Sequence, residues 1–338
     1  MNQRIAGLVV AVIAALSASL AGATSSGRPL RVAWVYAMAN APAVIAEKKG
    51  FYAAEGLDVE LTQFNDGPVI QQAVAAGEVD VAYVGAPPVY QWFSRGLDAR
   101  ILAKVNWGQA ALIASTAATP PIATLADLRG RRVAGVAKGS GMDVLLRGEV
   151  LTRRAGFDPD RDVTIVNMPA GNMAVALDRK LVDGAFTWEP FVSEAVLRGT
   201  AHVVLDVNQA VPHYPWYVIA ATPAVLKSRP DDIVKLLRAH RRAIAFLQEH
   251  PDEANALLVD AFGIRPLPGA SGQPVQPLAV VQEARKRLGW SARLEPGDLQ
   301  FIQHLMDDSF ALGFMGKRLK VDQVVDASWL QRAEQPAY

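Results

Sequence analysis

The chain alternates short apolar segments with amphipathic ones from residue 30 to residue 221. Short apolar runs suit strands buried in a sheet, and the longer segments between them suit helices. We expect strands at residues 30–36, 58–64, 79–84, 101–105, 110–115, 132–136, 163–167, 184–187, 202–206 and 216–221. Strands that alternate with helices in this way predict an α/β fold with largely parallel sheets.

Helical segments lie between these strands and continue after them. We expect helices at residues 42–54, 69–76, 88–95, 141–155, 172–180 and 190–198, and in the C-terminal part at 230–250, 251–262, 277–288 and 296–312. Each of the last four opens on a proline, which the first turn of a helix tolerates because its missing N–H has no intrahelical acceptor. The C-terminal part is therefore predicted to be helical.

A weak repeat divides the alternating region into two similar parts. One copy runs from Gly50 to Pro87 and the other from Gly156 to Pro190, and both read as strand, small-residue turn, helix, strand and proline-started helix. A chain of 338 residues can build one large or two medium cores. Any α/β protein repeats such units, so the repeat alone leaves one domain and two lobes equally open.

Two proline-containing segments supply the connections that two lobes would need. Thr119-Pro120-Pro121 follows the strand at 110–115, and residues 212–215 precede the strand at 216–221. We therefore expect lobe one at residues 28–117 and 216–338, lobe two at residues 118–215, and a hinge of two crossings. The helical C-terminal segment is expected to pack on lobe one.

The first 23 residues match the pattern of an export signal. Arg4 gives a charged start, an apolar run extends from residue 5 to residue 20, and Ala21-Gly22-Ala23 forms a small-x-small cleavage site. The apolar run is short for a bilayer span, so a retained anchor is the less favoured alternative. We expect cleavage after Ala23 and a periplasmic mature protein.

Composition and motifs disfavour several classes of protein. Zero cysteines exclude a lipid-modified cysteine, disulfides and thiolate metal sites. Thirty-four basic and 33 acidic side chains leave a net charge of +1, whereas a nucleic-acid partner would need a clustered basic surface. The sequence has no Gly-x-Ser-x-Gly elbow or histidine cluster, and Lys138-Gly139-Ser140 inverts the order of a phosphate-binding loop. We expect no enzyme activity, metal or cofactor.

Residues 135–142 join an apolar strand to a helix through small residues. Such a junction lets backbone N–H groups converge on an anion at the positive end of the helix. Ser140 with the N–H groups of Gly141 and Met142 is the donor set expected in lobe two. In lobe one the counterpart is the stretch Gly85-Ala86-Pro87, which precedes the next helix. For both stretches the alternative is a plain turn in which small residues only permit close packing.

Several aromatic and polar side chains are placed to complete a solute site. Trp188 follows the strand at 184–187, where the sheet edge would meet a cleft. Glu189 and Asp143 could meet a ligand ammonium or could stabilise a helix start. The remaining candidates are Tyr36, Asn40, Trp107, Tyr214 and Trp216. Core packing is the alternative for each aromatic residue, and we expect Trp188→Ala to weaken binding and to spare the stability of the ligand-free protein.

Five segments, taken in order, resemble a known family. They are KKGFY at 48–52, GEVDVA at 77–82, LADLRGRRVA at 125–134, KGS at 138–140 and VDGAFTWEP at 182–190. The chain resembles the periplasmic solute-binding proteins of ABC importers for sulfonates, taurine and nitrate. The resemblance implies a two-lobed periplasmic binding protein fold of type II, a hinge, and a monomer that closes on a small molecule and docks on a membrane permease.

One stretch departs from the taurine binders of that family. They carry an acidic residue near the start of the returning strand to meet the amine, whereas residues 214–218 read Tyr-Pro-Trp-Tyr-Val. This disfavours taurine and favours a larger or aromatic sulfonate or carboxylate, or a cationic ring stacked on aromatic side chains.

The expected function is capture of a small organic anion in the cleft. Two alternatives stay open. One is a binder of a thiamine-pyrimidine precursor, or a related pyrimidine-pathway enzyme. The other is a periplasmic module that reports its ligand to a membrane receptor.

Overall fold

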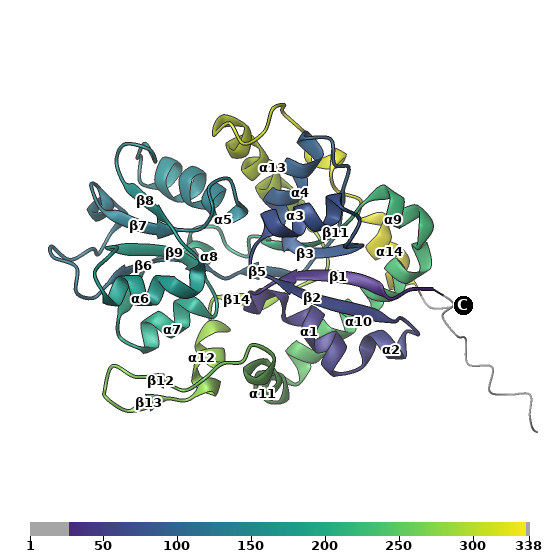
Figure 1. The fold of residues 1–338 in the computed structure, drawn as a ribbon, viewed down its shortest axis with the longest axis horizontal. Helices are drawn as coiled ribbons and strands as arrows, with labels where there is room; N and C mark the ends of the chain where they lie inside the picture. The colour runs from purple at the N-terminus through teal and green to yellow at the C-terminus, as the bar shows by residue number, and fades with distance from the viewer. Residues whose placement is uncertain (1–26, 336–338) are drawn as a thin grey trace, which may run out of the picture.

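The computed structural model describes residues 27–335 and contains two five-stranded mixed sheets, each flanked by helices (Figure 1). We call each sheet with its helices a lobe. The expected export signal lies outside the described residues. Within residues 27–335, no helix has both the length and the apolar character needed to cross a membrane.

The sheet of lobe one has the strand order β2-β1-β3-β11-β4. Its strands are β1 (Leu30–Val35), β2 (Val59–Phe64), β3 (Val81–Gly85), β4 (Arg100–Lys104) and β11 (Tyr217–Ala221). Strand β1 runs parallel to β2 and β3, and β11 runs antiparallel to β3 and β4. Strands β3 and β11 are buried along their whole length, because helices cover both faces of the sheet.

The sheet of lobe two has the order β10-β6-β9-β7-β8. Its strands are β6 (Ala110–Ser115), β7 (Arg132–Gly135), β8 (Thr164–Asn167), β9 (Gly184–Trp188) and β10 (Ala201–Asp206). Strand β7 is parallel to β8 and β9, whereas β6 is antiparallel to β9 and β10. Every strand expected from the apolar segments is present, with its ends within two residues of the prediction.

The helices also follow the prediction, with three differences. The expected helix at 277–288 ends at Ala284, and Leu288 begins a strand. The expected helix at 42–54 is broken at Gly50, whose φ of +66° ends one helix before the next begins. The helix that starts at Gly141 continues as a π-helical segment, Leu145–Arg154. The α-helices are α1 (Ala41–Lys48), α2 (Phe51–Ala54), α3 (Gly67–Ala75), α4 (Ala86–Ser94), α5 (Gly141–Val144), α6 (Met173–Asp178), α7 (Phe191–Leu197), α8 (Val207–Ala210), α9 (Pro223–Ser228), α10 (Pro230–Glu249), α11 (Pro251–Ala261), α12 (Pro277–Ala284), α13 (Pro296–Ala311) and α14 (Ser328–Glu334).

Strand β6 lies in lobe two, although we expected it to close lobe one. It pairs with β9 and β10, so the chain first crosses between the sheets at residues 105–109 and not near residue 117. It returns through residues 207–216, as expected. The apolar pattern identifies a strand but not its partner, and Thr119-Pro120-Pro121 marks a turn within lobe two.

The C-terminal segment contacts both lobes. Helices α10 and α14 pack on lobe one as expected, but α12 packs on α7 of lobe two. Strand β14 (Leu288–Trp290) pairs with β5 (Asn106–Gly108), the short strand in the first crossing. At Gly108, with φ +76°, a Cβ atom would lie 2.2 Å from the carbonyl oxygen of Arg287. Only glycine permits this close approach of the C-terminal segment to the hinge.

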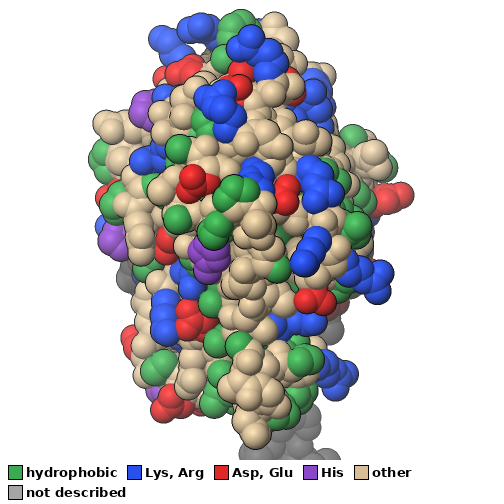
Figure 2. Space-filling view, turned by 90° about the vertical axis from the view of Figure 1, so that its left-hand side faces the viewer, with side chains coloured by type: hydrophobic (Ala, Val, Ile, Leu, Met, Phe, Trp, Pro, Cys, Tyr) green, Lys and Arg blue, Asp and Glu red, His purple; other side chains and the backbone are tan. Residues whose placement is uncertain are grey.

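The outer surface of lobe two carries a mixture of charges. Figure 2 shows this end of the molecule, where lysine and arginine side chains are interspersed with aspartate and glutamate. Many of these groups pair with one another, for example Arg129 with Asp162 and Arg161 with Asp158. Such exposed pairs contribute little to stability, so the fold depends on its buried residues.

Candidate functional site

Two adjoining cavities lie between the lobes. The larger has a volume of about 650 Å³ and the smaller about 30 Å³. Both are lined by Asp66 from lobe one and by Val136 and Trp188 from lobe two. A volume near 650 Å³ lies within the range of sites that hold small organic ligands, and the smaller cavity adjoins it at these three shared lining residues.

The smaller cavity lies where the N-termini of α4 and α5 meet. Ser140 is the N-cap of α5, and its hydroxyl oxygen accepts a hydrogen bond from the N–H of Asp143 at 3.3 Å. Gly141 and Met142 occupy the first two helical positions, where a helix offers their N–H groups no acceptor. Ser140, Gly141 and Met142 all line the smaller cavity, so the donor set expected in lobe two is assembled at the junction.

The lobes touch at this point. A Cβ atom on Gly141 would lie 3.2 Å from Pro87 and from the ring of Trp216. Pro87 belongs to α4 of lobe one, and Trp216 precedes β11 of the same lobe. The structure therefore shows the two lobes in contact across the helix tips.

The donor set expected in lobe one is largely committed elsewhere. The N–H of Ala86 donates to the carbonyl oxygen of Trp216 at 3.1 Å, which extends the pairing of β3 with β11. Pro87 has no N–H to donate and contributes an apolar contact instead. Gly85 lines the smaller cavity. The motif lies at the junction, but the amide of Ala86 already serves the sheet.

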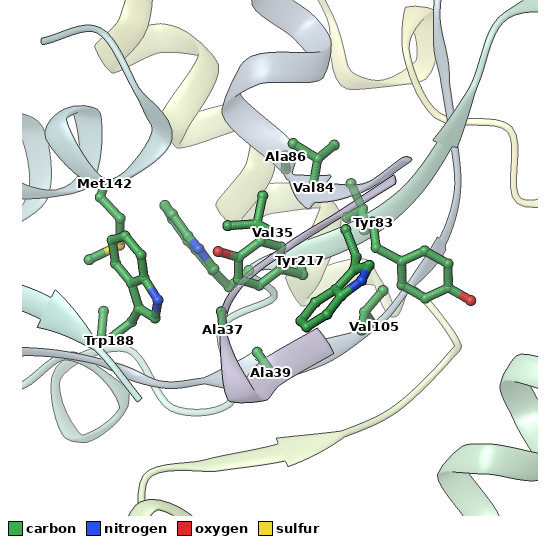
Figure 3. Packing of buried hydrophobic residues seen from close by; sticks show 14 of the residues in the cluster. Val35, Ala37, Ala39, Tyr83, Val84, Ala86, Val105, Met142, Trp188 and Tyr217 are labelled. Carbon is green, nitrogen blue, oxygen red and sulfur yellow. The ribbon is translucent and has the colours of Figure 1, made fainter. Parts of the chain in front are cut away.

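Trp188 links the two lobes at the cavities. It lies at the end of β9, and its indole Nε1 donates to the carbonyl oxygen of Tyr36 in lobe one at 3.1 Å. Figure 3 shows Trp188 and Met142 from lobe two on one side, and Val35 and Tyr217 from lobe one on the other. Trp188 lines both cavities and is only 5% exposed. The expectation that Trp188→Ala spares stability is therefore revised, because the truncation would also remove buried packing.

We predict that Trp188→Phe weakens solute binding about three- to tenfold. Phenylalanine keeps an aromatic wall but removes the hydrogen bond to Tyr36 between the lobes, which contributes on the order of 1 kcal/mol to the closed form. Calorimetric titration with a solute that binds the natural protein measures the effect. Unchanged affinity would show that this hydrogen bond does not favour the bound state.

Aromatic side chains form the wall of the larger cavity. Tyr36 and Phe191 both line it, and their ring centroids lie 5.9 Å apart. The Tyr36 hydroxyl donates to the carbonyl oxygen of Phe262 at 2.7 Å. Burial, followed by the charge of Glu194, raises the pKa of Tyr36 to about 12, so it stays protonated. The wall thus combines an apolar surface with fixed ring positions.

Three candidates in or beside the hinge do not line the cavities. The Asn40 amide donates to the carbonyl oxygen of Val35 at 2.8 Å, and the Tyr214 hydroxyl accepts from the N–H of Ala110 at 2.9 Å. Trp107 packs edge-on against His213, with ring centroids 4.7 Å apart. Tyr214 and Trp107 make their contacts at the two crossings, whereas the Asn40 contact lies within lobe one.

The two acidic candidates, Glu189 and Asp143, each form an ion pair with an arginine. Glu189 is fully buried, pairs with Arg287 at 3.1 Å and accepts the N–H of Ser193 at 3.1 Å. Burial raises the pKa of Glu189 to about 7, against the opposing effect of Arg287. Asp143 accepts the N–H of Gly139 and the Nε of Arg147, each at 2.8 Å. Neither carboxylate lines a cavity, so neither is placed to meet a ligand ammonium.

Sequence reasoning missed Asp66, which lines both cavities. It is the N-cap of α3, where one carboxylate oxygen accepts the N–H of Val69 at 3.2 Å. An aspartate directly before Gly67-Pro68 is a helix-start signal that could have indicated its position at the cleft. The linings of the two cavities include no lysine or arginine. Within residues 27–335, no group of three acidic or histidine side chains is arranged to hold a metal ion.

Two α/β lobes, joined by two crossings and enclosing a cavity, define the class of periplasmic binding proteins. The model of the NMT1/THI5-like family matches residues 38–254, and the chain belongs to this family. A protein of Bacillus subtilis named "Putative aliphatic sulfonates-binding protein" is 26% identical, over 86% of this chain and 84% of that protein.

Solved structures show the same fold. The periplasmic aliphatic sulphonate binding protein SsuA from Escherichia coli matches with a TM-score of 0.73 and 20% identity, over 89% of this chain and 92% of that chain. The periplasmic nitrate-binding protein NrtA from Synechocystis matches with a TM-score of 0.74 and 17% identity, over 90% of this chain and 88% of that chain. Structures with so little sequence identity share the fold of this chain but do not identify its solute.

Proposed function

We propose that this protein is the periplasmic solute-binding component of an ABC importer and captures a small organic molecule with an anionic group. The observation that carries the proposal is the cavity of about 650 Å³ between the lobes, with aromatic walls and the N-terminus of α5 beside it. Nitrate or bicarbonate would leave most of this space unfilled. A sulfonate or carboxylate with an apolar or aromatic body would fill it, in keeping with the sulfonate-binding name of the relative.

The proposed mechanism is capture by closure. Lobe one comprises residues 27–104 and 217–335, lobe two comprises residues 110–206, and the lobes rotate about the two crossings. The N–H groups of Gly141 and Met142, with the Ser140 hydroxyl, hold the anionic group. Tyr36 and Trp188 cover the body of the solute. Since the solute contacts both lobes only in the closed form, binding shifts the population toward that form.

The partners follow from the same proposal. The export signal expected at residues 1–23 would deliver the protein to the periplasm, where the closed form would dock on a permease of the inner membrane as a monomer. The name of the Bacillus subtilis relative favours a solute-binding protein over a pyrimidine-pathway enzyme.

We predict that the right solute raises the melting temperature by about 5 °C at a concentration of 100 times its Kd, because it binds only the folded protein. Tryptophan emission should change with it, since Trp188 and Trp216 line the cavities. A thermal-shift panel of alkyl and aromatic sulfonates, nitrate, bicarbonate, aromatic carboxylates and pyrimidines tests this. No stabilisation by any class would contradict the proposal, and turnover of a panel member would identify an enzyme.

A further inference from the structure

Asp66 places a carboxylate inside the proposed solute site. It lies between β2 and α3 and contributes to the lining of both cavities. One of its oxygens caps α3 through the N–H of Val69. Within the described chain, the second oxygen accepts no hydrogen bond from the protein. This oxygen therefore remains available to a ligand.

The charges around the cavities are unusual for a site that would take a simple anion. No lysine or arginine lines either cavity, and Asp66 is the sole carboxylic acid among the lining residues. The donors for an anionic group are backbone amides and a hydroxyl at the start of α5. A solute with only a negative charge would be attracted by these donors and repelled by Asp66 across the same cavity.

The cost of burying a charge favours a solute that pairs with both the donors of α5 and the Asp66 carboxylate. Closure of the lobes removes water from the cavity, so an unpaired Asp66 carboxylate would lose hydration without compensation. A protonated nitrogen on the solute would replace that water with a charge-assisted hydrogen bond. The aromatic rings of Tyr36 and Phe191 lie in the same larger cavity and can cover the part of the solute between its two charges.

We infer that the solute is zwitterionic, with its anionic group at the N-terminus of α5 and a protonated nitrogen at Asp66. The inference rests on the proposed function and specifies its substrate class. It also changes the interpretation of residues 214–218, where the missing carboxylate disfavoured an amine. In this protein the carboxylate comes from a different element, the loop before α3.

A matched pair of probes tests the inference directly. 4-(Aminomethyl)benzenesulfonate and 4-methylbenzenesulfonate have the same ring and sulfonate and differ by one ammonium group at pH 7. The natural protein should bind the aminomethyl compound about tenfold more tightly by calorimetric titration. The pair 4-(aminomethyl)benzoate and 4-methylbenzoate repeats the comparison with a carboxylate.

Asp66→Asn then assigns the preference to one side chain. Asparagine is as good an N-cap as aspartate, so α3 is retained, and unchanged melting of the ligand-free variant confirms it. We expect the variant to bind the two compounds equally, with weaker binding of the ammonium compound and equal or tighter binding of the methyl compound. Asp127→Asn is the control, since Asp127, the N3 residue of a capping box, also accepts backbone N–H groups at a helix start but is exposed and lines neither cavity.

The outcomes separate this inference from the proposed function. Equal binding of both compounds by the natural protein, or a preference that survives Asp66→Asn, would overturn the inference and leave capture of an organic anion in place. Failure of every solute in the wider panel would overturn both. A preference that disappears in Asp66→Asn and persists in Asp127→Asn supports the inference.

Discussion

Replacing Arg287 by methionine is expected to lower the free energy of unfolding by about 3–5 kcal/mol at pH 8. Arg287 lies between α12 and β14, and its guanidinium donates to Glu189 of lobe two at 3.1 Å and to Glu283 at 2.8 Å. Methionine retains an apolar stem but leaves the carboxylate of Glu189, which is 0% exposed, without its cationic partner. A buried charge without a partner is strongly destabilising.

The decrease in the free energy of unfolding caused by Arg287→Met should depend on pH. The pKa of Glu189 rises from about 4.5 in the unfolded chain to about 7 in the folded protein. The folded protein therefore retains this proton where the unfolded chain releases it, and the resulting stability is full below pH 4.5 and is lost as the pH rises through 7. Without Arg287 the folded pKa rises further. The variant should consequently be closer to the natural protein at pH 5.5 than at pH 8, as measured by urea unfolding.

Two further variants separate charge from packing. Glu189→Gln combined with Arg287→Met should recover most of the lost stability at pH 8, because no buried charge remains. Arg293→Met removes an exposed pair with Glu334, whose side chains are 64% and 25% exposed, and should change stability by less than about 1 kcal/mol. A loss for Arg287→Met that is independent of pH and not recovered by Glu189→Gln would show that packing, and not the charge, matters there.

The strands could be predicted because their signal is local. Residues 110–115 and 184–187 are apolar runs between turn residues, and both form strands where expected. Their pairing is not local. Strand β6 joins lobe two because its neighbours in space are β9 and β10, which lie far along the chain. The proline-rich turn after β6 suggested a boundary, but turn chemistry does not distinguish a turn within a lobe from a crossing between lobes.

The positions of the candidate site residues could be predicted only in part, for the same reason. Ser140 and Gly141 could be placed at the start of a helix because a strand, a glycine-rich turn and a helix are contiguous in sequence. The role of Ala86 could not be read from its own segment, since its N–H is satisfied by Trp216 more than a hundred residues later. Asp66 was missed because its importance comes from the opposite lobe, which converts an ordinary helix cap into part of a cavity wall.

Gly141→Leu is expected to weaken solute binding by about tenfold to a hundredfold while leaving the ligand-free fold intact. At Gly141 even a Cβ atom would lie 3.2 Å from Pro87 and from Trp216, so a leucine side chain cannot fit between the closed lobes. Overpacking of this kind costs on the order of 1–3 kcal/mol. The hinge lets the lobes separate and relieve the clash, and the apparent affinity then falls with the fraction of protein that can still close.

The matched control for this variant is Gly297→Leu. Gly297 also lies in the first turn of a helix, α13, but a Cβ atom there would meet nothing within 4 Å. The Gly297→Leu variant should bind solute with the affinity of the natural protein. Small-angle scattering with saturating solute should show a larger radius of gyration for Gly141→Leu than for the control, because closure is blocked. Natural affinity in Gly141→Leu would mean that contact between the tips of α4 and α5 is not part of the bound state, and the site would then lie in the larger cavity alone.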